Sequence, residues 1–254
     1  MFGVEGMGTS VTSWEPLINT ILGSASTSLL QPPPRHGPHC VLSHHPVDTI
    51  LISPRYNSGM SVEDVKKHIM SSDDWGASKL QLSNLSAIVK QFHLVAHENP
   101  SNSADEENGE KLLPTNHWSL FLTLGSSKIS SIRVEATPNE PEEPGMVVVE
   151  SKAYALTNRN TKAVSMDALE GITVADVFNL IIQKKRDYYI FAPAGEGCRF
   201  WLYTIAYDFA GANFISSAKA LEVQSALAMY WPTPMGTAAT ARPMIKGKFP
   251  KSGN

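Results

Sequence analysis

The sequence predicts one α+β domain, in which an antiparallel sheet of about four to five strands packs against helices. Strand-like segments follow one another between positions 117 and 156, whereas helix-like segments dominate the chain after position 173. The chain has 254 residues, 42% of them hydrophobic, which is enough for the core of one sizeable domain. We therefore expect a single domain over residues 61–232, with a loose segment on either side.

Residues 1–60 are expected to form a weakly structured leader. They combine three consecutive prolines with Ser, Gly and scattered histidines, and they show little hydrophobic periodicity. The leader holds a cluster of imidazole and thiol side chains whose spacing matches no familiar zinc module, so we predict no metal site there. Its members are His36, His39, Cys40, His44 and His45.

The domain is expected to begin with a short helix and a strand. Ser61 precedes two acidic residues and is typical of an N-cap, which predicts a helix start. Residues 85–96 follow the period of two of a strand, and the polar residues 98–109 are expected to form a surface loop. A meander of three further strands is predicted at residues 117–124, 129–136 and 146–156.

The second half of the domain is expected to be mainly helical. Thr173 to Asp176 resembles a capping box and precedes an apolar run, which predicts a buried helix. An aromatic strand is predicted at residues 188–191, followed by helices over residues 198–209 and 216–229. Residues 233–254 are rich in small residues and lysine and are predicted to be a mobile tail.

Composition excludes several classes of partner. The net charge is −3 and the basic residues are scattered, which argues against nucleic acid and against an anionic membrane surface. No apolar run reaches the roughly 20 residues needed to span a bilayer. Two distant cysteines and a poor signal peptide favour a cytoplasmic location. No phosphate loop or dinucleotide fingerprint occurs, so we expect a small-molecule substrate and no cofactor, while the oligomeric state stays open.

Cys198 is the main candidate for a reactive residue. It follows a small-residue loop, Gly195-Glu196-Gly197, and precedes an apolar helix-like stretch. The unpaired N–H groups and the positive dipole end of a helix N-terminus favour thiolate over thiol. The alternative is a structural cysteine beside a ligand pocket, because cysteine is among the most buried residue types.

A nucleophilic cysteine needs a base, and three histidines of the predicted domain sit on strands. His117 opens the first meander strand within Asn-His-Trp, where a strand end can expose its ring. His93 alternates with apolar neighbours, and His97 lies at the frayed end of its strand. His117 is therefore the preferred base.

The order of a strand histidine and then a cysteine at a helix start resembles the permuted papain-like fold of the lecithin:retinol acyltransferase-like families. The chain also resembles an uncharacterised fungal domain family that carries similar Asn-His-Trp and Gly-Glu-Gly-Cys-Arg-Phe-Trp blocks, over roughly residues 88–231. The papain-like resemblance implies Cys198 as nucleophile, His117 as base, and N–H groups of the helix start as part of an oxyanion hole. The third, orienting residue often comes from the neighbouring strand, and Glu135 has suitable chemistry for it. The other residues offered there are Ser130, Ser131 and Arg133.

The function expected from these resemblances is a cysteine-dependent hydrolase or acyltransferase of fungal metabolism that acts on a small acyl or amide compound. One alternative is a non-covalent cyclase or isomerase of secondary metabolism with an aromatic-lined pocket, and another is a binding protein without turnover. The residues considered as substrate-binding in either case are Trp118, Tyr189, Glu196, Arg199 and Trp201.

Overall fold

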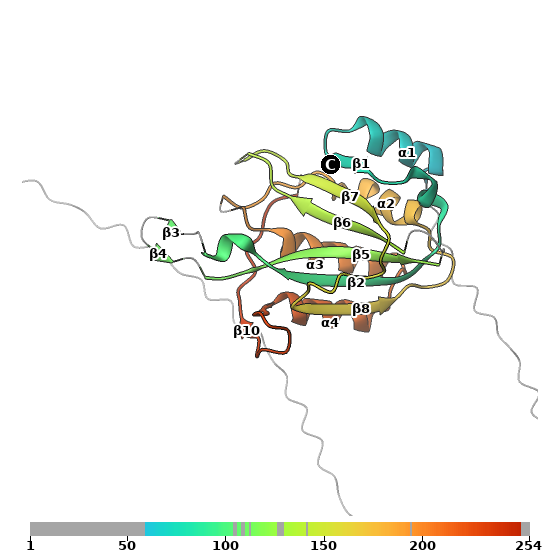
Figure 1. The fold of residues 1–254 in the computed structure, drawn as a ribbon. Coiled ribbons are helices and arrows are strands. Elements are labelled where there is room, and N and C mark those ends of the chain that lie inside the picture. The colour runs from blue at the N-terminus through green and yellow to red at the C-terminus, as the bar shows by residue number, and fades with distance from the viewer. Residues whose placement is uncertain are drawn as a thin grey trace, which may run out of the picture. The chain divides into compact units, whose positions relative to one another are not determined.

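The computed structural model describes residues 59–103, 106–107, 110–111, 113–125, 130–140, 142–193 and 195–249 (Figure 1). The predicted histidine and cysteine cluster of the leader lies outside the described residues. None of the described helices combines the length and the apolar character that crossing a bilayer requires.

A six-stranded mixed sheet forms the centre of the described domain, with the strand order β1-β7-β6-β5-β2-β8. Its strands are β1 (Trp75–Lys79), β2 (Val89–Glu98), β5 (Asn116–Leu124), β6 (Ser131–Thr137), β7 (Met146–Lys152) and β8 (Lys162–Asp167). Strands β1 and β7 pair in parallel, and the other neighbours pair antiparallel. The α+β class is thus confirmed, whereas the prediction of a purely antiparallel sheet of four to five strands is wrong.

The error has a physical cause at the two edges of the sheet. Strand β1 is only five residues long, contains Gly76, and pairs with β7 about seventy positions away in the chain. Strand β8 lies beside β2 at the opposite edge, and only two of its six residues are buried. Short edge strands give weak periodicity, so the sequence predicted the central strands and missed both edges.

The helices are α1 (Val62–Ser71), α2 (Val174–Gln183), α3 (Cys198–Gly211) and α4 (Ser217–Leu227). Helix α3 packs on β5 and β6, and α4 packs on β8, so both lie on one face of the sheet (Figure 1). Phe92, Trp118 and Phe209 are buried in the layer between sheet and helices. Smaller elements complete the described chain: the 3₁₀ helices η1 (Leu82–Ser86) and η2 (Pro100–Ser103), and the strand pairs β3 (Glu106–Glu107) with β4 (Glu110–Lys111) and β9 (Met229–Tyr230) with β10 (Thr240–Ala241).

The predicted helix starts are confirmed. Ser61 accepts from the backbone N–H of Asp64, and Thr173 accepts from that of Asp176, each within a reciprocal capping box. The aromatic strand predicted at residues 188–191 is not part of the sheet, because Ile190 forms only isolated bridges, to Pro144 and Lys248, among the described residues.

The other face of the sheet is covered by residues 153–161. The Tyr154 ring lies 6.4 Å from that of Phe121, and the Tyr154 carbonyl accepts from Ser131 at 2.6 Å. Under this cover Ser119 and Phe121 of β5 are buried, in addition to the even-numbered residues of the strand. At the first residues of β5 the cover ends, and a cavity opens.

Candidate active site

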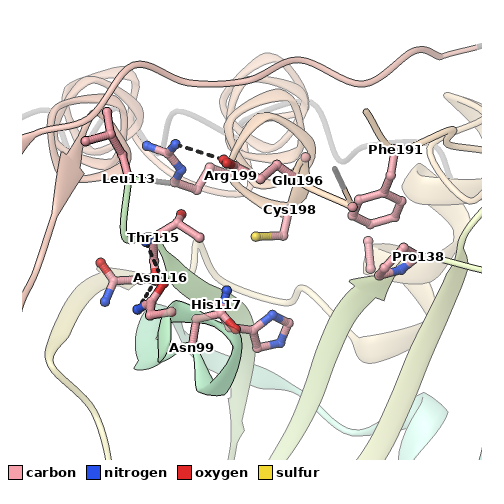
Figure 2. A pocket seen from close by; sticks show the side chains of 14 residues that line it. Asn99, Leu113, Thr115, Asn116, His117, Pro138, Phe191, Glu196, Cys198 and Arg199 are labelled. Carbon is pink, nitrogen blue, oxygen red and sulfur yellow. Dashed lines mark hydrogen bonds and ion pairs between the residues drawn. The ribbon is translucent and has the colours of Figure 1, made fainter. Parts of the chain in front are cut away.

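A cavity of about 330 Å³ opens where the start of β5, the end of β6 and the start of α3 meet (Figure 2). This volume is in the range of small-molecule sites. Polar side chains and a few apolar ones share the lining, which comprises Asn99, Asn102, Leu113, Thr115, Asn116, His117, Ala136, Pro138, Phe191, Gly195, Glu196, Gly197, Cys198 and Arg199.

Cys198 is the first residue of α3 and is partly exposed to this cavity. The N-cap of α3 is Gly197, which has no side chain to accept from the first turn. Helices α1, α2 and α4 instead each follow a Ser or Thr N-cap, whose hydroxyl accepts a hydrogen bond from a backbone N–H of the first turn. The N–H groups of the first turn of α3 therefore face the cavity end of the helix without a capping side chain.

The backbone conformation explains why glycine precedes the cysteine. Gly197 has φ +152°, and a Cβ there would lie 2.8 Å from the Tyr189 hydroxyl oxygen. That hydroxyl donates to the Gly197 carbonyl at 3.0 Å and so fixes the turn into α3. A side chain at position 197 would push the start of the helix away from Tyr189.

His117 lies beside Cys198 in the cavity (Figure 2). Its Nε2 is 3.0 Å from Oε2 of Glu135 on the adjacent strand β6. Burial of the ring opposes its charge, but hydrogen bonds with Cys198 and Glu135 outweigh burial and raise the pKa of His117 to about 10. The ring is thus held as an imidazolium between a sulfur and a carboxylate at neutral pH.

Glu135 is held in turn by a positive charge. Arg133 Nη2 lies 2.9 Å from Oε1 of Glu135 and 2.9 Å from Oε2 of Glu150. Burial would raise the pKa of Glu135, but the hydrogen bond with His117 and the charge of Arg133 lower it. The carboxylate is therefore ionised and oriented towards His117.

The other two strand histidines lie elsewhere. His97 is paired with His117 across the strands, with ring centroids 6.3 Å apart, but its Nε2 bonds Ser119 and its Nδ1 bonds the Arg159 carbonyl. His93 lies further along the same face between Ser165 and Thr123. Burial lowers the pKa of both rings, which favours their neutral forms.

The structure brings Cys198, His117 and Glu135 together, and it divides the five residues predicted to bind substrate. Trp118, Trp201 and Tyr189 are fully buried and are not among the residues that line the cavity. Glu196 and Arg199 do line it, but they pair with each other at 3.6 Å.

Sequence reasoning missed the remaining lining residues. The segment that contains Asn99 and Asn102 was expected to be a surface loop, yet Asn102 hydrogen bonds both backbone groups of Thr115 and so joins the wall in front of β5. Pro138 and Phe191 add an apolar patch on another side of the cavity. Polarity alone could not show that this loop folds back over a site.

The sequence profile of a family described as a domain of unknown function (DUF7770) matches residues 92–250, which is more than half of the chain and includes the whole cavity wall. This agrees with the expectation of an uncharacterised domain family. No curated protein and no solved structure matches the chain. Among the described residues there is no cluster of three or more His, Cys, Asp or Glu side chains suited to a metal ion.

Proposed function

We propose that this chain, which belongs to the DUF7770 family, is a cysteine-dependent hydrolase or acyltransferase for small acyl or amide compounds. The observation that carries the proposal is the arrangement of Cys198, His117 and Glu135 at one cavity. A helix start, an imidazolium and an orienting carboxylate are the parts that activate a thiol.

In the proposed reaction the Cys198 proton has already passed to His117 before the substrate binds, so that a thiolate faces the imidazolium. The thiolate then attacks the substrate carbonyl carbon and forms a C–S bond, while the carbonyl electrons move to oxygen. When the tetrahedral intermediate collapses, the bond to the leaving group breaks and His117 gives that group its proton. Water or an acceptor alcohol or amine then gives a proton to His117 and attacks the thioester carbon. The C–S bond breaks, the acyl group leaves with the acceptor, and Cys198 is again a thiolate beside a protonated His117.

The start of α3 supports the stabilisation of this intermediate. Its first-turn N–H groups carry no capping side chain, so they are suited to an oxyanion. Glu135 supports the imidazolium while the negative charge is on the substrate. The papain-like likeness inferred from the sequence belongs to the same proposal, since it places the same residue types at a helix start and on a strand.

The alternative of a cyclase or isomerase has less support. It expects aromatic walls, whereas Phe191 is the one aromatic ring other than the His117 imidazole among the described residues that line the cavity. A cavity of about 330 Å³ with asparagine, threonine and glutamate side chains fits a compact polar acyl compound better than a polyene.

Trapping of an acyl-enzyme tests the proposal. The full chain is mixed with p-nitrophenyl acetate, quenched in acid and digested for mass spectrometry. We expect an acetyl group on the peptide that contains Cys198, release of nitrophenol, and loss of both in Cys198→Ala. A Cys40→Ala variant is the matched control and should keep both. Nitrophenol release that persists in Cys198→Ala, with no acetyl group on the wild-type thiol, would contradict the proposal.

A further inference from the structure

We infer that residues 240–249, the C-terminal strap, position the Cys198 and His117 side chains relative to each other, and that Arg242 is the positioning residue of the strap. The inference rests on the proposed function, because it concerns the geometry of that same pair. Arg242 itself is not among the residues that line the cavity and has no place in the proposed reaction.

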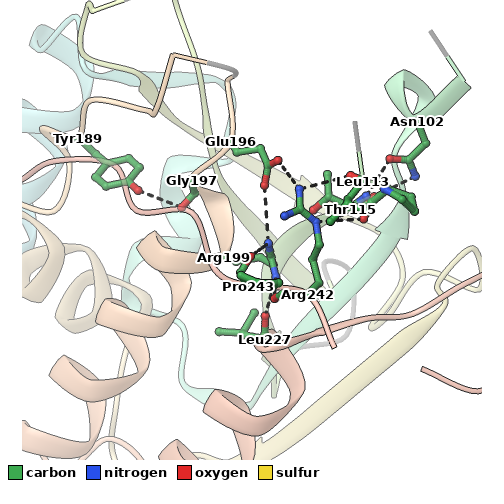
Figure 3. Close-up of polar contacts among 11 residues, drawn as sticks. Asn102, Leu113, Thr115, Tyr189, Glu196, Gly197, Arg199, Leu227, Arg242 and Pro243 are labelled. Carbon is green, nitrogen blue, oxygen red and sulfur yellow. Dashed lines mark hydrogen bonds and ion pairs between the residues drawn. The ribbon is translucent and has the colours of Figure 1, made fainter. Parts of the chain in front are cut away.

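Arg242 contacts both halves of the site. Its Nη2 forms an ion pair at 2.5 Å with Oε1 of Glu196, two residues before Cys198 (Figure 3). Its Nε and Nη2 also donate to the carbonyls of Pro114 and Leu113, each at 3.3 Å, in the segment that leads into β5 and His117. One guanidinium therefore bridges the loop of the nucleophile and the strand start of the base.

Arg199 holds the strap from the other side. The Arg199 residue is 3% exposed, and its guanidinium donates to the carbonyls of Leu227 at 3.1 Å, Arg242 at 2.9 Å and Pro243 at 2.8 Å. It also pairs with Glu196. The Arg199 guanidinium is buried and bonds backbone carbonyls and one carboxylate, so its role is structural. We therefore assign Arg199 and Glu196 to holding the strap in place.

The distal end of the strap contacts the same loop. The N–H of Gly247 donates to the Tyr189 hydroxyl at 2.9 Å, and that hydroxyl donates to the Gly197 carbonyl at 3.0 Å. Lys248 and Ile190 exchange two backbone hydrogen bonds, at 2.7 and 2.9 Å. The segment predicted as a mobile tail is thus bonded to the core at both ends of residues 240–249.

The chain just before the strap contacts the residue next to the base. Trp231 donates its N–H to Asn116 Oδ1 at 2.7 Å, and Asn116 Nδ2 donates to the Trp231 carbonyl at 2.8 Å. These two bonds fix the start of β5 at the residue before His117. The C-terminal region therefore touches the sequence neighbours of both reactive side chains.

The experiment measures two properties of the pair in the full chain: the His117 titration by NMR and the rate of Cys198 alkylation by iodoacetamide at pH 7. We expect Arg242→Gln to lower the His117 midpoint by at least about half a pH unit and to slow alkylation about threefold or more, because the Cys198 contact loosens. Arg242→Lys keeps the charge and should recover part of both values. Lys219→Gln removes one positive charge from an exposed pair on α4 and should change neither.

A second variant tests the strap without a charge change. A Cβ at position 247 would lie 2.3 Å from the Ile190 carbonyl oxygen and 2.4 Å from the Tyr189 hydroxyl, so Gly247→Ala should lift the strap. We expect faster hydrogen exchange in residues 195–199 and slower Cys198 alkylation, even if Arg242→Gln does not fold. If wild-type Cys198 reacts rapidly and both variants leave the titration, alkylation and exchange unchanged, the strap inference is overturned while the proposed function stands. If wild-type Cys198 itself reacts no faster than free cysteine, the proposed function fails first.

Discussion

The His117 ring lies between the sulfur of Cys198 on one side and the Glu135 carboxylate, 3.0 Å away, on the other. Each of them stabilises the protonated ring, and together they overcome the cost of burying a charge. Arg133 binds the Oε1 atom of Glu135 at 2.9 Å while the Oε2 atom contacts His117, so the carboxylate is held by a partner at each oxygen. The reactivity proposed for Cys198 is thus a property of four side chains rather than of a lone cysteine.

An NMR titration of the histidines tests this arrangement. Since the pKa of His117 is raised from 6.5 to about 10, we expect its ring to stay protonated through neutral pH and to lose its proton near pH 10. The stability it contributes is complete below pH 6.5 and is lost as pH rises through 10. Cys198→Ala and Glu135→Gln should each lower the midpoint, because each removes a group that favours the charge.

His93 and His97 serve as internal references in the same spectra. Burial lowers the pKa of both, so their midpoints should lie below 6.5. A His117 midpoint at or below theirs would mean that the ring has no charged partner, and the arrangement would be wrong.

Of the three residues at the site, the sequence predicted Cys198 and His117 and left the orienting residue open. The position of a residue in the chain was sufficient to identify the one cysteine of the predicted domain and the histidine at a strand start. The orienting residue depends on register: Leu120 pairs with Val134, and this pairing puts residues 117 and 135 on one face. Without the register, Ser131, Arg133 and Glu135 are equivalent, since all three share that parity.

Among the helices of the described domain, α3 stands out at its first turn. Gly197 replaces the hydroxyl caps of the other three helices, and its backbone takes a φ of +152°. Glycine at this N-cap leaves space against Tyr189 and leaves the first-turn N–H groups uncapped. The loop before the helix therefore serves the cavity more than the stability of the helix.

Glycine-to-alanine substitutions at the two ends of α3 distinguish the role of Gly197 at the cavity from a general effect on the stability of the helix. Gly197→Ala should lower the free energy of unfolding by about 1–3 kcal/mol and slow Cys198 alkylation, because the new Cβ meets the Tyr189 hydroxyl at 2.8 Å. Gly211→Ala at the other end of the same helix meets nothing within 4 Å and should be neutral or stabilising by about 0.5–1 kcal/mol. Urea unfolding and alkylation rates measure both effects, and equal behaviour of the two variants would refute the role given to Gly197.

Element prediction from the sequence succeeded where local chemistry decides. The capping boxes at Ser61 and Thr173 fixed two helix starts. It failed for β1 and β8, whose pairing partners are distant in the chain. It also failed for residues 188–191, where Tyr189 is buried against the strap rather than in a sheet and Tyr188 is exposed. Tertiary contacts override local pattern at such places.

Across the whole domain, a row of ion-paired side chains extends over the sheet from the candidate site towards the β1 edge. Glu150 on β7 pairs with Arg133 at 2.9 Å, with Lys79 at 3.1 Å and with Lys152 at 2.5 Å. Burial would raise its pKa, but these partners lower it from 4.5 to about 2. The cluster joins three strands, including the parallel edge pair β1 and β7. The mixed sheet was not predictable because this pairing joins segments far apart in the chain.

Acid unfolding tests the contribution of this cluster. A carboxyl whose pKa is lowered stabilises the fold above pH 4.5, and this stabilisation is lost as pH falls through about 2. Urea unfolding at several pH values should show the wild-type free energy falling over this window, with a flatter curve for Glu150→Gln. Parallel curves for the two proteins would place the acid sensitivity elsewhere.

The rate of iodoacetamide alkylation at pH 7, resolved by peptide mass spectrometry into Cys198 and Cys40, addresses the nucleophile most directly. Both thiols are then compared within one chain, and free cysteine provides the outside reference. We expect Cys198 to react at least about tenfold faster than free cysteine, and we expect His117→Ala to remove the difference. Alkylation of Cys198 no faster than that of free cysteine, in a folded chain, would contradict it.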